Sequence, residues 1–366
     1  MNVRERFRAI CNFEKPDRLP RHETWGFWRE TLQRWAGEGL PDSIVENEDR
    51  AFRYFGCDPL NWIPTSFGTD EPGFWPPFET EVIEETDSFI IKKDISGNTV
   101  KEFTDGRSTI PQYLESPVKT INDFEDLKPR LDPETSDRLT LLIDPMIELT
   151  QADESCLTGI YTTGLFGMYR HLMGLVGLSV SLKKNPGLLH AIAAHWVHFT
   201  GTLISQIREK QEVDFVLFWE DMAYKNGPMI SPQAFRQFMS PYYKQVIEYV
   251  KDDTDIEVYC VDSDGDVTLL IPLFIEAGIN MMLPFEVNAG MDVRTVREQH
   301  PDLIILGGID KRALFSDEKS IRQEVMKIVP PMLEKGGYFP CLDHNVPPEV
   351  SLKNFETYLE IIRGLS

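Results

Sequence analysis

Ionisable side chains follow short apolar segments at intervals through the C-terminal two thirds of the chain. Each apolar segment is typical of a buried strand, and each is followed by acids, a lysine or a histidine. Such side chains, if they are brought to one place, could transfer protons or bind a divalent cation. In chain order they are Glu220 and Asp221, Asp262 and Asp264, Glu286, Asp310 and Lys311, and Asp343 and His344.

Oxygen and nitrogen donors of these types suit Zn²⁺ or Mn²⁺. The candidate metal ligands are Glu220, Asp262, Asp264 and His344, with Glu286 as a further candidate. Alternatively, one carboxylate with a raised pKa acts as the acid while His344 shuttles the proton. Lys311 could neutralise the acids or hold an anionic substrate. The predicted catalytic residues are therefore Glu220, Asp262, Asp310, Lys311 and His344.

The same acids also have ordinary structural roles. Asp221 and Asp310 each precede an expected helix and could be its N-cap, and Asp264 could belong to a solvated turn. Crowded carboxylates raise one another's pKa and oppose folding, so many of them at one rim require a cation, a proton or a polar ligand. The functional hypothesis therefore depends on the convergence of five residues at one pocket: Glu220, Asp262, Glu286, Asp310 and His344.

Six strand-plus-helix units in succession would position these residues. From about residue 156 onward, segments of helical period alternate with apolar segments at 157–164, 214–221, 256–266, 278–287, 303–310 and 336–344. Nearly continuous apolar strands favour parallel strands covered by helices on the outside. In a (β/α)₈ barrel the active site lies at the C-terminal ends of the strands, where the ionisable residues stand in this sequence.

Two more strands would close such a barrel, and the N-terminal third supplies candidates at 18–26 and 60–68. A doubly wound sheet is the alternative, but no GxGxxG motif opens a helix after the first strand. Residues 80–103 alternate apolar and polar around a turn at 96–99, which predicts an antiparallel excursion near one barrel end. We therefore predict an α/β fold, a single (β/α)₈ TIM barrel domain over 1–366 with a β-hairpin insertion at 80–103.

The charge and composition of the chain limit its partners. Its 366 residues include 37 Lys and Arg against 59 Asp and Glu, a formal net charge of −22, which disfavours nucleic acids and anionic membranes. No uninterrupted apolar stretch of about 18 residues is present, and the first residues lack the apolar run of a signal peptide. Five scattered cysteines do not indicate a disulfide framework. We expect a cytoplasmic protein that acts on a small molecule.

Several stretches of the chain resemble a known family. FWEDMAYKNGPMISPQAF, VDSDGD, LPFEV, LGGIDKRALF and GGYFPCLDHNVPPEVSLKNF are similar to the uroporphyrinogen decarboxylase superfamily. The resemblance covers essentially the whole chain and is strongest from about residue 210 onward. It implies a (β/α)₈ barrel and one of two activities: decarboxylation of a tetrapyrrole, or corrinoid-dependent transfer of a methyl group to a thiol or a pterin.

The resemblance to the decarboxylases implies a set of substrate contacts. Their N-terminal motif supplies arginines, and the corresponding stretch HETWGFWRETLQRW has Trp25 at one arginine position and Arg29 at another. Their active-site tyrosine corresponds to Tyr169 or Arg170, and their histidine corresponds to His344. With positions at the expected rim, the predicted substrate-binding residues are His22, Trp25, Arg29, Tyr169, Arg170, Glu286 and Asp343.

The methyltransferases of the superfamily bind zinc through a His-x-Cys motif and a distant cysteine. These positions correspond to Asp262-Ser263-Asp264 and to the neighbourhood of His344, with Cys341 three residues before it. Oxygen and nitrogen in place of sulfur favour a pterin, a phenolic compound or another non-thiol acceptor or donor.

We therefore hypothesise a corrinoid-linked methyltransferase or demethylase component with a divalent metal. The corrinoid would come from a carrier protein, and the family resemblance makes a homodimer a reasonable expectation. The alternatives are decarboxylation of a tetrapyrrole or another carboxylated substrate, and a non-catalytic protein that binds a corrinoid or a small ligand.

Overall fold

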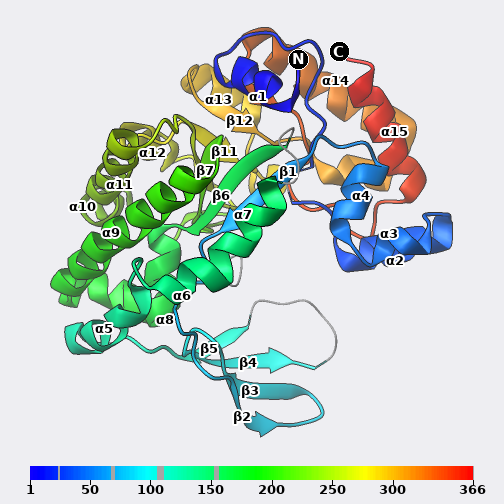
Figure 1. Ribbon diagram of the computed structural model, residues 1–366. Helices are drawn as coiled ribbons and strands as arrows, with labels where there is room; N and C mark the ends of the chain where they lie inside the picture. Colours follow the sequence, from blue (N-terminus) through cyan, green and yellow to red (C-terminus); the bar gives the residue numbers. More distant parts are fainter. Residues whose placement is uncertain (24, 67–70, 105–110, 152–155, 366) are drawn as a thin grey trace.

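The computed structural model describes residues 1–366 except 24, 67–70, 105–110, 152–155 and 366. Its centre is a parallel sheet of seven strands that curls into an incomplete barrel with helices on its outer side (Figure 1). This arrangement confirms the predicted barrel-like α/β fold. The strands, in spatial order, are β1 (Leu60–Pro64), β6 (Leu157–Thr163), β7 (Phe215–Trp219), β10 (Tyr259–Asp262), β11 (Met281–Leu283), β12 (Ile304–Leu306) and β13 (Tyr338–Phe339).

All six predicted strand-plus-helix units are present. Ser231 caps the first helix after β7 by accepting a hydrogen bond from the Ala234 N–H, and Pro232 is the first helical residue. The helices that follow the strands are α8 (Leu165–Lys184) and α9 (Pro186–Lys210), α10 (Pro232–Phe238) and α11 (Ser240–Asp253), α12 (Ile271–Glu276), α13 (Val293–Gln299), α14 (Glu318–Lys335) and α15 (Leu352–Arg363). One-turn 3₁₀ segments, η3 (Val287–Ala289) and η4 (Lys311–Phe315), follow β11 and β12.

The expected first strand at 18–26 is wrong. Its described residues form no strand, and the chain makes a single parallel bridge just beyond it, between Phe27 and Val346. The carboxylate of Glu23 accepts a hydrogen bond from the Leu342 N–H at 3.1 Å. In a strand ladder a backbone carbonyl would accept that hydrogen bond. A side-chain contact thus takes the place of a ladder beside β13. The other elements of this region are α1 (Val3–Cys11), α2 (Arg29–Glu38), α3 (Asp42–Val45) and α4 (Glu48–Tyr54).

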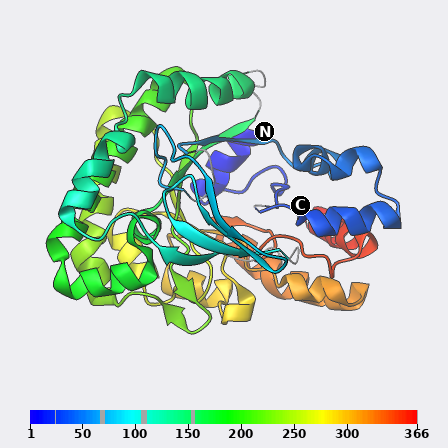
Figure 2. The same cartoon turned by 90° about the horizontal axis from the view of Figure 1, so that it is seen from below.

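The predicted antiparallel excursion is a four-stranded sheet, with its turn at Gly97 in a left-handed conformation of φ 80°. Seen from below, this sheet lies across one end of the barrel (Figure 2). Its strands are β2 (Glu81–Glu85), β3 (Phe89–Lys93), β4 (Thr99–Phe103) and β5 (Gln112–Glu115). The chain returns to the barrel through α5 (Ile121–Leu127), η1 (Lys128–Leu131), α6 (Ser136–Arg138), η2 (Leu139–Ile143) and α7 (Asp144–Gln151).

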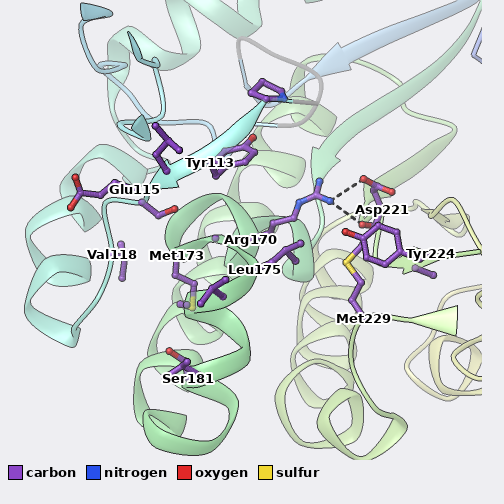
Figure 3. A pocket seen from close by; sticks show the side chains of 18 of the residues that line it. Tyr113, Glu115, Val118, Arg170, Met173, Leu175, Ser181, Asp221, Tyr224 and Met229 are labelled. Carbon is purple, nitrogen blue, oxygen red and sulfur yellow. Dashed lines mark hydrogen bonds and ion pairs between the residues drawn. The ribbon is translucent and has the colours of Figure 1, made fainter. Parts of the chain in front are cut away.

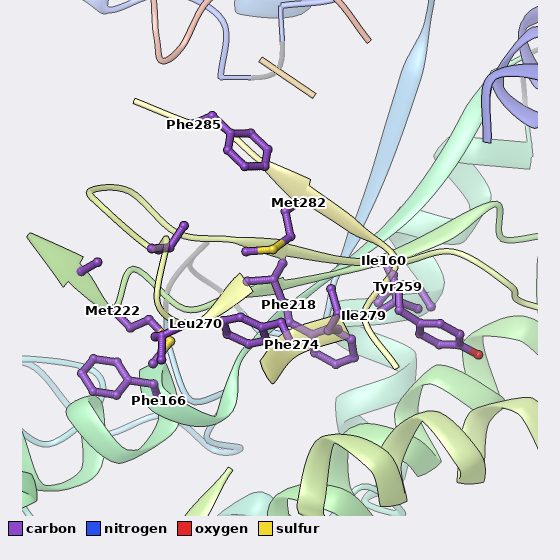
Figure 4. Close-up of a cluster of buried hydrophobic side chains, with 14 of the residues drawn as sticks. Ile160, Phe166, Phe218, Met222, Tyr259, Leu270, Phe274, Ile279, Met282 and Phe285 are labelled. Atoms are coloured by element: carbon purple, nitrogen blue, oxygen red, sulfur yellow. The ribbon is translucent and has the colours of Figure 1, made fainter. Parts of the chain in front are cut away.

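The strands separate two apolar cores. Successive side chains of a strand point to opposite faces, and along β7 Val216 and Phe218 pack with the helices while Phe215 and Leu217 pack inside the barrel. Figure 4 shows part of the outer core, where side chains from strands and helices meet. Because both faces of these strands are buried, both rows of side chains are apolar.

Helix α8 joins the antiparallel sheet to the barrel. Its backbone breaks at Gly174, whose φ of 65° is left-handed, and the Leu172 carbonyl accepts the Val118 N–H at 2.9 Å. The segment that leaves β5 is therefore docked on the break in the helix. Among the described residues α8 is the one helix long and apolar enough to cross a membrane, and 56% of that stretch is buried inside the fold. Packing in the core accounts for much of its apolar character.

Candidate functional site

Three side chains from three different loops meet at the C-terminal ends of the strands. Asp264 follows β10, Glu286 follows β11 and His344 follows β13, and one potential ligand atom from each lies within 4.8 Å of the others. His344 Nε2 is 3.3 Å from Asp264 Oδ2. All three side chains are half-buried. Two carboxylates and one imidazole are a donor set that fits a divalent cation such as Zn²⁺ or Mn²⁺.

A glycine allows the loop after β10 to approach the loop after β7. Gly265 adopts φ 79°, and a Cβ atom at this position would lie 2.5 Å from the Ala223 carbonyl oxygen. Its N–H donates to Glu286 Oε2 at 3.0 Å. The backbone after β10 therefore fixes the carboxylate after β11, and a larger residue at 265 would push both away from the loop after β7.

Asp343 holds the loops around the cluster together through hydrogen bonds. It is 1% exposed, and its Oδ2 accepts the Val287 N–H at 2.9 Å. Its Oδ1 accepts both the N–H and the Nζ of Lys311, at 3.1 and 3.3 Å. Asp343 thus links the loops after β11, β12 and β13 and stands beside two members of the cluster, Glu286 and His344. Lys311 Nζ is also 3.9 Å from Glu286 Oε1.

The crowding of negative charge shifts the pKa values of the cluster. Burial, and then the charge of Asp264, raises the pKa of Glu286. Burial alone would lower the pKa of His344, but the hydrogen bond and charge of Asp264 raise it overall. Burial together with the charges of Asp264, Asp221 and Glu286 raises the pKa of Asp262 well above its ordinary value. The cluster therefore favours species that bring positive charge, either protons or a cation.

A large cavity is lined both by residues of the cluster and by residues of the antiparallel strand β5. Figure 3 shows side chains of its walls, among them Tyr113, Arg170 and Asp221. Its volume is about 1490 Å³, and Asp264 and Glu286 contribute to its lining. One wall comes from α8 and from β5, and the opposite wall comes from the loop after β7. That loop includes the short hairpin of β8 (Ala223–Tyr224) and β9 (Gly227–Pro228). The cluster therefore faces a space large enough for substrate.

Glu220, predicted as a catalytic residue and metal ligand, is used elsewhere. It is completely buried, and its carboxylate accepts hydrogen bonds from the Gly167 N–H at 2.9 Å and from the Tyr243 hydroxyl at 2.5 Å. Gly167 lies in the first turn of α8, where free N–H groups attract a carboxylate. Burial raises the pKa of Glu220 to about 7, and the hydrogen bonds oppose that rise. Glu220 therefore anchors α8 to the end of β7, away from the cluster.

Asp262 and Asp310 also lie outside the group of three. The inward-facing row of β10 ends in Asp262, which is 5% exposed, and no hydrogen bond from a described residue reaches its carboxylate. Asp310 caps η4 and binds the side chain of Arg312 through both oxygens. Partial burial opposes ionisation of Asp310, but the hydrogen bonds from Arg312 lower its pKa overall. The N-cap alternative thus describes the contacts of Asp310.

The predicted contacts from the N-terminal segment and α8 separate into two groups. Arg170 lines the cavity. Tyr169 is buried, and its hydroxyl donates to the carbonyls of Leu189 and Phe238. His22, Trp25 and Arg29 do not line the cavity: His22 stacks on Phe52, Trp25 packs edge-on against Tyr161, and Arg29 is an exposed residue at the start of α2.

Sequence reasoning missed most of the residues that line the cavity, among them Tyr113, Trp219 and Lys225. Trp219 is the last residue of β7 and belongs to the inward-facing row, so its position one residue before Glu220 was the available signal. Tyr113 comes from β5, which reaches the cavity through the docking of the antiparallel sheet on α8. No local pattern marks that contact.

The fold and the cluster together define a parallel α/β-barrel protein with a candidate divalent-metal site at the mouth of the barrel. The uroporphyrinogen decarboxylase (URO-D) family profile matches residues 99–365, and the chain belongs to this family, which consists of enzymes.

Curated relatives are distant. The chain is 24% identical over 257 residues to a uroporphyrinogen decarboxylase of Prochlorococcus marinus (strain MIT 9312), covering 68% of this chain and 70% of that protein. It is 21% identical over 255 residues to a uroporphyrinogen decarboxylase of Crocosphaera subtropica (strain ATCC 51142 / BH68), covering 66% of this chain and 68% of that protein. These identities support membership of the family.

Proposed function

We propose that this chain is a metal-dependent, corrinoid-linked methyltransferase or demethylase that acts on a small molecule in the cavity. The observation that carries the proposal is the meeting of Asp264, Glu286 and His344 at the barrel mouth. Asp264 and His344 occupy the positions that resemble zinc-ligand positions of the methyltransferase branch, and they are in contact. Glu286 adds a third donor from a different loop.

Asp264, Glu286 and His344 would hold the cation. When bound, a divalent cation supplies a Lewis acid that polarises an oxygen of the substrate or stabilises its oxyanion. With oxygen and nitrogen ligands in place of thiolates, the site favours a substrate oxygen or nitrogen over a thiol.

The remaining residues of the mouth orient the ligands and handle a proton. Asp343 directly precedes His344 and accepts the N–H groups of Val287, next to Glu286, and of Lys311, so both ligands have a defined position before substrate arrives. Burial and the charges of Asp264, Asp221 and Glu286 raise the pKa of Asp262, so its carboxyl group binds a proton more readily than an exposed aspartate does. That proton is available to the leaving oxygen or nitrogen of the substrate.

The size of the cavity supports two reactants. Pockets for a single small ligand have volumes of about 300–1,000 Å³, whereas this cavity measures about 1490 Å³. The excess space is what a second, larger reactant requires, and in this proposal it is the corrinoid presented by a carrier protein.

Metal analysis and a corrinoid assay test the proposal together. We expect the purified protein to bind close to one equivalent of Zn²⁺ or Mn²⁺, and Asp264→Asn or His344→Gln to lose it. The matched control is Asp310→Asn, which removes an acid at a neighbouring strand end that is paired with Arg312. Incubation with methylcobalamin and tetrahydrofolate, or with free cob(I)alamin and methoxyaromatic donors, should change the corrinoid absorbance. Absence of both metal and spectral change would remove the proposal.

Decarboxylation is the second candidate, because the curated relatives are named uroporphyrinogen decarboxylase. The charges of the cavity weigh against a substrate with eight carboxylates. Among the described residues its lining has three cations, Lys119, Arg170 and Lys225, and two of these already pair with acids. Direct assay of uroporphyrinogen turnover separates the two candidates, and we expect no turnover.

A further inference from the structure

Arg170 is a polar feature of the cavity that the metal cluster does not use (Figure 3). Its Nη1 donates to the Asp221 carbonyl at 3.0 Å and to the Asp221 carboxylate at 2.9 Å. Its guanidinium lies over the ring of Trp219, 4.7 Å from the ring centre. Among the described residues these contacts use Nη1 alone. Nε and Nη2 are therefore left as two donors in one fixed plane.

A guanidinium held in this way is prepared for a planar anion. Two neighbouring N–H groups of arginine match the two oxygens of a carboxylate, and stacking on an aromatic ring keeps the plane from rotating. The side chain of Arg170 is only 14% exposed, so a bound carboxylate would be largely shielded from water. Asp221 adopts a left-handed backbone with φ 41°, a conformation that directs both its carbonyl and its carboxylate at Arg170.

The walls around Arg170 indicate what the rest of the ligand is made of. The α8 wall presents Met173, Leu175, Val176 and Val180 to the cavity, and β5 presents Tyr113 and Leu114. These side chains offer contact area and few hydrogen bonds, so they suit an apolar or aromatic body.

The charge balance of the cavity indicates how many carboxylates it accepts. Four acids, Glu115, Asp221, Asp264 and Glu286, line it with three cations, Lys119, Arg170 and Lys225. A divalent cation on the cluster would reverse this balance to one net positive charge. One carboxylate on the substrate then completes the neutralisation, whereas several would again leave excess negative charge.

We propose that Arg170 anchors the carboxylate of the substrate, which makes the substrate class a monocarboxylate with an apolar or aromatic body. The inference rests on the proposed function for the reacting end of the molecule. The anchoring contact itself requires no methyl transfer, so binding can be measured without turnover.

Calorimetric titration of the full-length protein with benzoate and with benzamide tests the anchor. The two probes have the same shape and differ in charge and in hydrogen-bond acceptors. We expect the Zn²⁺-supplemented protein to bind benzoate at least tenfold more tightly than benzamide. Equal affinity for the two probes would overturn the proposal without the need for any variant.

Two matched variants separate a specific contact from general electrostatics. Arg170→Gln should weaken benzoate binding at least tenfold and leave benzamide binding unchanged. Lys225→Gln removes the same charge from an exposed part of the same cavity and should change benzoate binding less than threefold. Arg170→Lys keeps the positive charge but loses the two parallel N–H donors of the guanidinium. The affinity of this variant for benzoate should lie between those of wild type and Arg170→Gln. Equal losses in Arg170→Gln and Lys225→Gln would overturn the anchor.

The Asp264→Asn variant distinguishes failure of this inference from failure of the proposed function. In that variant Zn²⁺ binding should be lost, while the preference for benzoate over benzamide should persist and still depend on Arg170. A protein that prefers benzoate but binds no metal contradicts only the proposed function. A protein that binds Zn²⁺ but shows no preference contradicts only the anchor.

Discussion

The two ends of the barrel differ in how their acidic residues are paired with positive charge. At the N-terminal end of the strands, Asp214 lies 3.1 Å from Arg4, and Arg18 binds both oxygens of Asp58. At the C-terminal end, the pair Asp264 and Glu286 has no arginine partner among the described residues. Lys311 is 3.9 Å from Glu286 and closer to Asp343, and His344 is 3.3 Å from Asp264.

This difference indicates which end of the barrel still requires a ligand to balance its charge. Asp214 and Asp58 each pair with an arginine of the same chain, so the protein itself supplies the positive charge beside them. Acids that crowd together beside one lysine and one histidine remain unbalanced. Burial, followed by the charge of neighbouring acids, raises the pKa values of Glu286 and Asp262. The N-terminal end is therefore structural, and the C-terminal end requires a proton, a cation or a ligand.

The largest expected effect comes from the apolar cluster inside the barrel that includes Phe7, Phe215 and Phe339. The ring of Phe7 lies between those of Phe215 and Phe339, with centres 5.5 and 5.4 Å apart. Phe7→Ala should lower the free energy of unfolding by about 3–5 kcal/mol, measured by urea denaturation. Zn²⁺ affinity of the folded variant should stay within a factor of two. A tenfold loss of metal affinity would show that the two ends are not independent.

Glu220 tests the same difference at the C-terminal end, because it is a buried acid there with no cationic partner among the described residues. Burial raises its pKa to about 7 from 4.5, so the folded state binds the proton more tightly than the unfolded state. Its contribution to stability is therefore present below about pH 4.5 and decreases as pH rises toward 7. Glu220→Gln removes that dependence. Its stability relative to wild type should rise between pH 5 and 8 by up to about 3 kcal/mol, measured by thermal unfolding. A constant difference would contradict this role.

Asp343 tests whether a paired acid at the mouth serves the cluster. In Asp343→Asn one carboxylate oxygen becomes an amide NH₂ group. That group would face either the Val287 N–H or Lys311, so one of the two contacts is lost. The loops beside Glu286 and His344 should loosen. We expect Zn²⁺ affinity to fall by roughly 10–100-fold, with a change in the d–d spectrum of the Co²⁺ form. A lowered melting temperature with unchanged metal affinity and spectrum would assign Asp343 to folding alone.

Asp310 should give the smallest effect. Its carboxylate caps η4 by accepting the Arg312 N–H and pairs with the Arg312 side chain, without joining the cluster. Asp310→Ala should cost about 1 kcal/mol of stability, the usual value for a lost cap, and leave metal affinity unchanged. Chemical denaturation and metal titration of the same preparation measure both. Loss of metal binding in Asp310→Ala would show that Asp310 contributes to the metal site.

The local elements of the fold could be predicted because their causes are local. Ser231 and Pro232 start α10 as their chemistry predicts, and the spacing of Ile321, Val325 and Ile328 marks the buried face of α14. The strand expected at 18–26 failed because Glu23, a side chain within it, takes over a backbone contact to Leu342. No alternation pattern reports such a substitution.

The identity of the strand-end acids was predictable, but their directions were not. Glu220 and Asp264 both follow apolar strands, yet one turns back to α8 and the other faces His344. In a sheet buried on both faces both rows of side chains are apolar, so the sequence does not reveal which row points into the barrel. Asp310 is the exception, because its partner Arg312 is two residues away and visible in the sequence.

The six strand-plus-helix units, the antiparallel excursion and the acids at the strand ends follow from the amino-acid pattern, since periodicity and spacing act over a few residues. The meeting of Asp264, Glu286 and His344, the contacts of Asp343 beside them and the position of Arg170 on the cavity depend on how the elements pack together. Those contacts join loops that are far apart in the sequence. Their geometry depends on the curl of the sheet and on the docking of the antiparallel strands on α8.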